Sequence, residues 1–217
     1  MSRHLPPSIV LIGASTGGTR VLPEILSRLP LLPACIVIVQ HMPKFINESL
    51  ARSLAKNTPA KVRLAQDGDS LAEGLILLAP SGVHCRLIRN RNLCLAPGEP
   101  VNFVCPSIDV LMRSAQPPAG QQRLIGVLLT GMGNDGAAGL LHIKTLGGLT
   151  MAQNQASCAV YGMPAVAARL GCVDYELPPV EIARRLEAIT LRQGNQNFAL
   201  TSGSAGAKSW ADARDRW

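Results

Sequence analysis

The sequence predicts an α/β fold in which a doubly wound, mostly parallel sheet carries helices on both faces. Three short apolar runs, residues 9–12, 35–39 and 124–130, are rich in leucine, isoleucine and valine, and a stretch with helical spacing follows each run. This alternation is typical of parallel strands that are buried on both faces. We therefore expect a single doubly wound domain over residues 1–191.

The remaining elements follow from local signals. Asn90-Arg91-Asn92 separates two apolar runs, which indicates a small antiparallel hairpin. Ser107 is a candidate helix N-cap, and the Pro-Pro-Ala-Gly segment 117–120 is typical of a loop. Further strands are expected at 62–64, 75–79, 82–88, 93–96 and 149–152, and helices at 18–29, 45–56, 108–115, 136–146, 163–169 and 179–190.

The composition describes an aliphatic globular domain. Of the 217 residues, 47% are hydrophobic but only 3% are aromatic, so the core must consist mainly of leucine, valine, isoleucine and alanine. From residue 192 onward the sequence changes to glycine, serine, alanine, asparagine and glutamine. This change predicts a flexible C-terminal tail over residues 192–217.

Charge and cysteine usage narrow the classes of partner. The net charge of +7 would allow an anionic partner, but the basic residues are scattered and aromatic residues are scarce, which argues against nucleic-acid binding. The six cysteines show neither a C-x-x-C pair nor zinc-like spacing, so we expect reduced thiols and no metal. Without a signal peptide or an apolar run near the ~20 residues of a membrane span, we expect a cytoplasmic protein with no membrane insertion.

Three polar motifs follow the three apolar runs directly. Ser15 follows the first, His41 the second and Asp135 the third. Because the carboxyl ends of parallel strands lie along one edge of a sheet, these side chains are expected to meet in one crevice. A serine, a histidine and an aspartate are the components of a nucleophilic hydrolase.

The motif around Ser15 has competing interpretations. Residues 13–17, Gly-Ala-Ser-Thr-Gly, fit G-x-S-x-G, a tight turn that exposes a serine hydroxyl at the start of a helix. A structural turn or a phosphate loop would look similar. However, the sequence has no G-K-[ST], and Gln40-His41 occupies the place of the acidic residue that a dinucleotide fold requires. The nucleophile is therefore favoured over a nucleotide site.

His41 and Asp135 also have plain structural interpretations. A histidine after a strand is commonly a hydrogen-bonded loop residue, and only its position beside Ser15 favours a base. Asp135 could simply cap the helix expected from residue 136, although both roles are compatible. His84 lies in an expected hairpin strand, where a structural role is favoured. The chain order Ser–His–Asp differs from that of the α/β-hydrolases.

Six longer motifs between roughly residues 8 and 190 occur in the order of one known family. The sequence resembles the catalytic domain of the chemotaxis protein-glutamate methylesterases, the CheB family, in segments 12–18, 40–43, 79–84, 106–111, 129–137 and 152–164. The resemblance implies hydrolysis of glutamate γ-methyl esters on the cytoplasmic helices of chemoreceptors, with release of methanol. Family members often also deamidate receptor glutamines.

The resemblance also implies a role for each site residue. Ser15 would be the nucleophile, His41 the general base and then acid, and Asp135 the orienting carboxylate. The backbone N–H groups of Thr16 and Met132 would stabilise the oxyanion. Neither a metal nor an organic cofactor is implied.

Two departures from the family pattern affect the expected regulation and specificity. The sequence begins almost at the first catalytic strand, where family members carry a receiver domain, so we expect a separate regulatory partner and activity independent of a phosphodonor. The basic residues that precede the family's Pro-Ser motif are replaced by Phe103-Val104-Cys105, which indicates an altered choice of substrate. The alternatives are a serine esterase or amidase of the same fold with another substrate, and a non-catalytic binding module, which the complete Ser/His/Asp set disfavours.

Overall fold

The computed structural model describes residues 5–191 and contains a central sheet of seven parallel strands. The strand order is β3-β4-β2-β1-β7-β8-β9, and every neighbouring pair is parallel. The strands are β1 (Ser8–Ala14), β2 (Ala34–Gln40), β3 (Lys61–Leu64), β4 (Leu75–Leu78), β7 (Arg123–Leu128), β8 (Leu149–Gln153) and β9 (Tyr175–Leu177). The predicted α/β class with a parallel sheet is confirmed.

Helices cover both faces of the sheet, because the central strands carry apolar residues on both faces. Val10 and Ile12 of β1 face the core beneath α1 (Gly18–Leu26), α2 (Asn47–Ala55) and α6 (Pro179–Leu191). Ile9 and Leu11 face the opposite core, beneath α3 (Ile108–Arg113), α4 (Ala137–Thr145) and α5 (Met163–Arg169). Each face thus buries its own aliphatic cluster.

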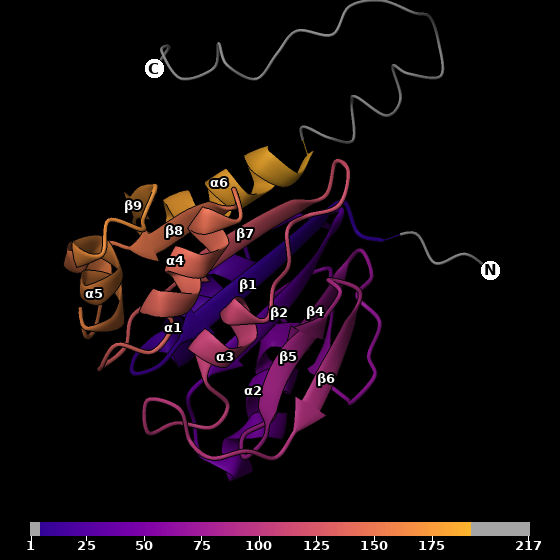
Figure 1. Cartoon of the computed structure of the whole chain (residues 1–217), viewed down its shortest axis with the longest axis horizontal. Coiled ribbons are helices and arrows are strands. Elements are labelled where there is room, and N and C mark those ends of the chain that lie inside the picture. Colours follow the sequence, from indigo (N-terminus) through magenta and orange to yellow (C-terminus); the bar gives the residue numbers. More distant parts are fainter. Residues whose placement is uncertain (1–4, 192–217) are drawn as a thin grey trace, which may run out of the picture.

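The expected antiparallel hairpin is present as a separate two-stranded sheet. It consists of β5 (His84–Ile88) and β6 (Asn92–Ala96). Cys85, Leu87 and Leu93 of the hairpin join the same core as α3. In Figure 1 the hairpin lies beside α3, on the other side of the domain from α5 and β9.

Several predicted boundaries differ from the structure. The helix expected over 18–29 ends at Leu26, since Arg28 and Leu29 close tight turns onto Ile25 and Leu26 before Pro30, and a residue preceding proline disfavours the helical conformation. The helix expected over 45–56 divides into a 3₁₀ turn, η1 (Lys44–Ile46), and α2. Neither β9 nor the 3₁₀ turn η2 (Gln155–Ser157) was predicted, because three residues are too few to show a period.

The topology places a crevice beside β1. From β1 the chain continues to β2, β3 and β4 on one side, and it later returns to β7 on the other side. The loops after β1 and β7 therefore diverge at the topological switch point, where α/β sheets bind ligands.

The other sequence expectations have mixed outcomes. Cys35, Cys85 and Cys172 are buried free thiols, as expected, whereas Cys94, Cys105 and Cys158 are half-buried. Among residues 5–191, no helix is both long and apolar enough to cross a membrane. The predicted tail over residues 192–217 lies outside the described residues.

Candidate active site

Strand register brings Ser15 and His41 together. Ala14 at the end of β1 pairs with Gln40 at the end of β2, so Ser15 and His41 are the next positions on adjacent parallel strands. The His41 N–H donates to the Ala14 carbonyl at 2.9 Å, which continues the ladder by one step. Neighbouring strands lie about 4.8 Å apart, so the two side chains leave the sheet edge at adjacent points.

The turn that follows Ser15 is fixed from both sides. The Ser15 N–H donates to the Thr130 carbonyl beyond β7 at 3.0 Å, and its own carbonyl accepts a 2.9 Å bond from the buried Gln40 side chain. Gly17 then adopts a φ of 89° as the N-cap of α1, a left-handed conformation that favours glycine. Ser15 is therefore held at the entrance to a helix while its side chain stays partly exposed.

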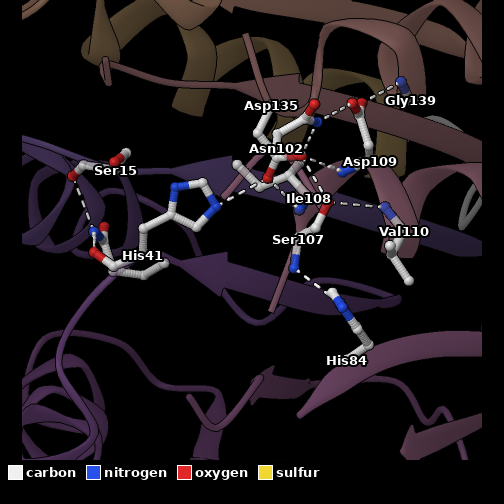
Figure 2. A network of polar contacts seen from close by, with 11 residues as sticks. Ser15, His41, His84, Asn102, Ser107, Ile108, Asp109, Val110, Asp135 and Gly139 are labelled. Atoms are coloured by element: carbon white, nitrogen blue, oxygen red, sulfur yellow. Dashed lines mark hydrogen bonds and ion pairs between the residues drawn. The ribbon is translucent and has the colours of Figure 1, made fainter. Parts of the chain in front are cut away.

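His41 and Asp135 form the central polar pair of the site. His41 Nε2 lies 2.9 Å from Asp135 Oδ2, and in Figure 2 the imidazole lies between Ser15 and Asp135. An ionised carboxylate only accepts hydrogen bonds, so Nε2 must carry the proton. The unprotonated Nδ1, on the Ser15 side in Figure 2, is then free to accept a proton from a serine hydroxyl.

The structure shows no hydrogen bond between Ser15 and His41, the further contact that a catalytic triad would use. Among the described residues, Ser15 Oγ makes no hydrogen bond to His41 or to any other group. Catalytic hydrogen bonds are often long in ligand-free enzymes and tighten when substrate binds. The structure thus brings His41 and Asp135 into contact and places Ser15 beside them with a free hydroxyl.

Asp135 is anchored by a different helix from the one that its sequence position indicates. The N-cap of α4 is Gly136, with a φ of 91° and no side-chain cap, so the interpretation of Asp135 as the cap of its own helix is wrong. The carboxylate instead accepts hydrogen bonds at the start of α3, where backbone N–H groups are unsatisfied within the helix. Its donors there are Ile108 N (2.6 Å), Asp109 N (3.2 Å) and Ser107 Oγ (2.6 Å), and Asn102 Nδ2 from the preceding turn also donates to it (2.9 Å).

These donors keep the Asp135 carboxyl ionised in a buried position. Asp135 is only 3% exposed. Burial opposes ionisation, but hydrogen bonds from His41, Ser107, Asn102 and the Ile108 N–H outweigh it and hold the pKa of the carboxyl below its usual value. The site therefore supplies the carboxylate that an orienting role requires.

Ser107 binds the Asp135 carboxylate directly, and His84 binds the Ser107 backbone. The Ser107 hydroxyl donates to Asp135 and accepts from Val110 N, which confirms the predicted N-cap of α3. Its backbone N–H donates to His84 Nδ1 at 3.2 Å, while His84 Nε2 lies 2.9 Å from the Glu99 carbonyl. Those partners fix the His84 tautomer with its proton on Nε2, which donates to the Glu99 carbonyl.

The loops after β1 and β7 also present free backbone donors. Among residues 5–191, the N–H groups of Thr16 and Met132 donate to no protein acceptor. Thr130 Oγ1 ties the two loops together by donating to the Thr16 carbonyl at 2.9 Å. Free N–H groups beside a nucleophile can stabilise a developing oxyanion.

An open groove of about 490 Å³ runs beside Ser15. It is lined by the loops after β1 and β2 and by α2, including Ser15, Thr16, His41, Met42, Ile46 and Leu50. A cavity of similar size, about 530 Å³, lies near the amino ends of β7 and β8, but the described residues lining it include no serine, histidine or carboxylate. The groove beside Ser15 therefore has the side chains for hydrolysis that this second cavity lacks.

Two residues of the site had no sequence signal for their contacts. Gln40 served only to exclude a nucleotide fold, yet its amide binds both the Ser15 and the His41 carbonyls at 2.9 Å. The sequence predicts no role for Asn102, although it contacts Asp135 directly. Its single clue is an isolated asparagine between apolar residues, a residue type that tolerates a left-handed backbone.

Gly131 allows the loop after β7 to approach Ser15 closely, so its replacement tests that approach. A Cβ at this position would lie 2.5 Å from Ser15 Cβ and 2.7 Å from Met163 Sδ. We expect Gly131→Ala to displace Ser15 and to lower turnover about 10²-fold, with an unfolding penalty of about 1–3 kcal/mol. Ester hydrolysis and urea denaturation measure the two effects.

Gly126→Ala is the matched control for this change. Gly126 lies inside β7, away from Ser15, and its Cβ would lie 2.7 Å from atoms of Ile143 and Leu140 in α4. It should cost comparable stability and leave turnover intact. Equal turnover in both variants would show that close packing against Ser15 is unimportant.

A parallel α/β domain with a serine, a histidine and an aspartate at the switch point of its sheet has the architecture of a serine hydrolase. The family model described as CheB methylesterase matches residues 10–186. The chain therefore belongs to the CheB methylesterase family.

Individual relatives agree with this assignment. A protein-glutamate methylesterase/protein-glutamine glutaminase of Symbiobacterium thermophilum is 43% identical over 192 residues, covering 88% of this chain and 52% of the relative. A protein of the same name from Pectobacterium atrosepticum is 41% identical over 86% of this chain and 55% of its own length. The crystal structure of the Thermotoga maritima CheB methylesterase catalytic domain aligns with a TM-score of 0.77 and 35% identity, covering 83% of this chain and 97% of that chain. This chain spans about half the length of the curated relatives it matches.

Proposed function

We propose that this chain is a protein-glutamate methylesterase that hydrolyses γ-methyl esters of glutamate side chains on chemoreceptors. The observation that carries the proposal is the 2.9 Å contact between His41 and the ionised Asp135, beside a free Ser15 hydroxyl, in a domain of the CheB methylesterase family. No metal or organic cofactor is required for this chemistry. Among the described residues, no group of histidine, cysteine and carboxylate side chains could hold a metal ion.

In the first half of the reaction Ser15 becomes acylated. Its Oγ attacks the ester carbonyl carbon while His41 Nδ1 takes the hydroxyl proton, and Asp135 stabilises the resulting imidazolium. The carbonyl oxygen becomes an oxyanion that the N–H groups of Thr16 and Met132 stabilise, each such donor typically contributing about 10²–10³ in rate. Collapse breaks the bond to the methoxy oxygen, which receives the His41 proton and leaves as methanol.

In the second half water replaces methanol. His41 removes a proton from water as it attacks the acyl-serine, and the same proton then returns to Ser15 as glutamate is released. A glutamine side chain would follow the same course with ammonia as the leaving group. The proposed glutaminase activity therefore needs no further residue.

Exposed apolar side chains near the site support a protein as the substrate. Phe103, Phe45 and Met132 are 101%, 81% and 78% exposed, the highest values among the large apolar residues described. Phe45 lies in η1, four residues after His41, whereas Met132 precedes Asp135 by three and Phe103 adjoins Asn102. Exposed apolar surface around a site is typical of protein recognition. Chemoreceptor cytoplasmic helices as the substrate would also place this protein in the cytoplasm.

Methanol release from a methylated chemoreceptor cytoplasmic fragment tests the proposal. We expect release by the wild-type chain and only the background rate with Ser15→Ala, with ammonia release measured in parallel on a glutamine-containing fragment. Ser15-dependent hydrolysis of p-nitrophenyl acetate without methanol release would instead favour a serine esterase with another substrate. No labelling of Ser15 by a serine-directed phosphonate would favour a binding module. Control by a separate regulatory partner stays a prediction.

A further inference from the structure

Asn102 contacts two buried carboxylates at once. Its side-chain nitrogen donates to Asp109 Oδ2 at 2.8 Å and to Asp135 Oδ1 at 2.9 Å. An amide nitrogen carries two hydrogens, so each hydrogen is committed to a different carboxylate. Figure 2 shows the Asn102 side chain between the two acids.

Asp109 is a second buried acid that the proposed reaction does not use. It is 6% exposed, and its other oxygen accepts a 2.6 Å bond from the Gly139 N–H. Burial raises the pKa of the Asp109 carboxyl above its usual value, and the nearby charge of Asp135 adds to that rise, while hydrogen bonds from Gly139 and Asn102 oppose it. The two carboxylates thus repel each other in a place with little solvent.

The backbone around Asn102 forms a tight turn that directs its side-chain amide toward the two carboxylates. Val101 and Val104 exchange two backbone hydrogen bonds of 3.1 and 3.2 Å across a two-residue turn. Within the turn, Asn102 and Phe103 have φ values of 54° and 65°, the left-handed geometry of a type I′ hairpin turn. Asparagine is among the few residues that accept this conformation readily. The turn exposes Phe103 fully and directs Asn102 inward.

We propose that Asn102 is a positioning residue for the hydrolysis, which holds the Asp135 carboxylate in the orientation that aims Oδ2 at His41 and offsets its repulsion by Asp109. Without the amide, Asp135 Oδ1 would keep only Ser107 Oγ and the longer Asp109 N–H contact as donors. The carboxylate could then rotate away from His41. The inference rests on the proposed function for the reaction, but the ionisation of Asp135 is measurable without any substrate.

Asn102→Gly removes the amide and retains a residue that adopts positive φ without strain. We expect the rate of Ser15 acylation by p-nitrophenyl acetate to fall about 10- to 100-fold, the equivalent of one lost hydrogen bond to a charged group, with little change in KM. Arg89→Gly is the matched control. Arg89 has a φ of 53° in the turn between β5 and β6, and its exposed side chain lies five residues from His84. This control should retain the wild-type rate.

The titration of the two carboxyls separates positioning from a general structural defect. Because the amide favours the ionised form of both acids, its removal should raise the pKa of Asp135 and of Asp109. ¹³C NMR of labelled aspartate carboxyls, assigned with Asp135→Asn and Asp109→Asn, measures both.

A double variant tests whether Asn102 acts through the pair of acids. In Asp109→Asn the new amide would face the Asn102 amide, donor against donor, unless it gives up the Gly139 N–H. In the double variant Asn102→Gly with Asp109→Asn that conflict disappears, and the combined loss should be smaller than the product of the single losses. A strictly multiplicative loss would contradict the inference.

The outcomes for Asn102 and for the proposed function are distinguishable. Acylation of Ser15 without methanol release would refute the proposed function and leave the Asn102 comparison intact. Conversely, if Asn102→Gly matches the wild-type chain in carboxyl titration and acylation rate, the inference is overturned whatever the substrate. If p-nitrophenyl acetate is not turned over, an unchanged titration of Asp135 overturns the inference and a raised pKa supports it.

Discussion

Replacement of Ser15 by alanine is expected to abolish turnover almost completely while the domain stays folded. Loss of a triad nucleophile typically lowers the rate by about 10⁴–10⁶. Ser15 Oγ has no hydrogen-bond partner among the described residues, and the backbone bonds from Ser15 N to Thr130 and from Gln40 to Ser15 O need no side-chain oxygen. Kinetics of methyl ester hydrolysis and chemical denaturation measure the two expectations.

Ser8→Ala provides the matched control at the other end of the same strand. Ser8 is completely buried at the start of β1, and its Oγ is without a hydrogen-bond partner among the described residues. Removing an unpaired buried hydroxyl should leave the activity unchanged and the stability equal or slightly higher. If Ser15→Ala kept most of the wild-type turnover, the assignment of Ser15 as nucleophile would be wrong.

The central strands were accessible from sequence because each one is a short aliphatic run. Runs such as 35–39 and 124–129 have no charged or strongly polar residue on either face, which only a strand covered from both sides tolerates. Strand β9 lacked this signal, since Glu176 is exposed and its neighbours are only half-buried. An edge strand of three residues is defined by its pairing with β8, a tertiary contact that local sequence does not encode.

The site likewise contains residues that the sequence predicts and contacts that only tertiary packing creates. Ser15, His41 and Asp135 each follow a predicted strand, so topology alone places them on one edge of the sheet. The donors to Asp135 come instead from a turn and a helix start that precede it by about 30 residues, and their approach depends on how α3 packs over β1. Local sequence therefore favoured a cap on α4, whereas packing directs the carboxylate to α3.

Replacement of Asp135 by asparagine should be nearly as damaging as loss of the nucleophile. The carboxylate faces only donors: His41 and Ile108 at Oδ2, and Ser107, Asn102 and Asp109 at Oδ1. An amide has one acceptor and one donor end, so in either orientation its NH₂ group meets N–H groups. Where the NH₂ group faces His41, Nε2 must become the acceptor and the proton moves to Nδ1.

A proton on Nδ1 would disable the base, because Nδ1 is the nitrogen that should accept the Ser15 proton. The corresponding change in a serine protease lowers kcat about 10⁴-fold through the same tautomer effect, and we expect a loss of that order here. The unpaired donors should also cost about 1–3 kcal/mol of folding free energy. Steady-state kinetics and urea denaturation of Asp135→Asn measure both.

The pH dependence of stability gives this prediction a second, independent measure. The pKa of Asp135 lies below its unfolded value of about 3.8, so its ionised form stabilises the fold above that pH and the contribution is lost as the pH falls toward the folded pKa. Asp135→Asn should flatten this acid-side decline in the free energy of unfolding. Asp174→Asn is the control for the rate, because the pKa of Asp174 is also lowered by bonds from Thr150 and Lys144, but at the amino end of β8, away from Ser15. It should lower stability and leave the rate unchanged. A wild-type rate in Asp135→Asn would reduce Asp135 to a structural support for α3.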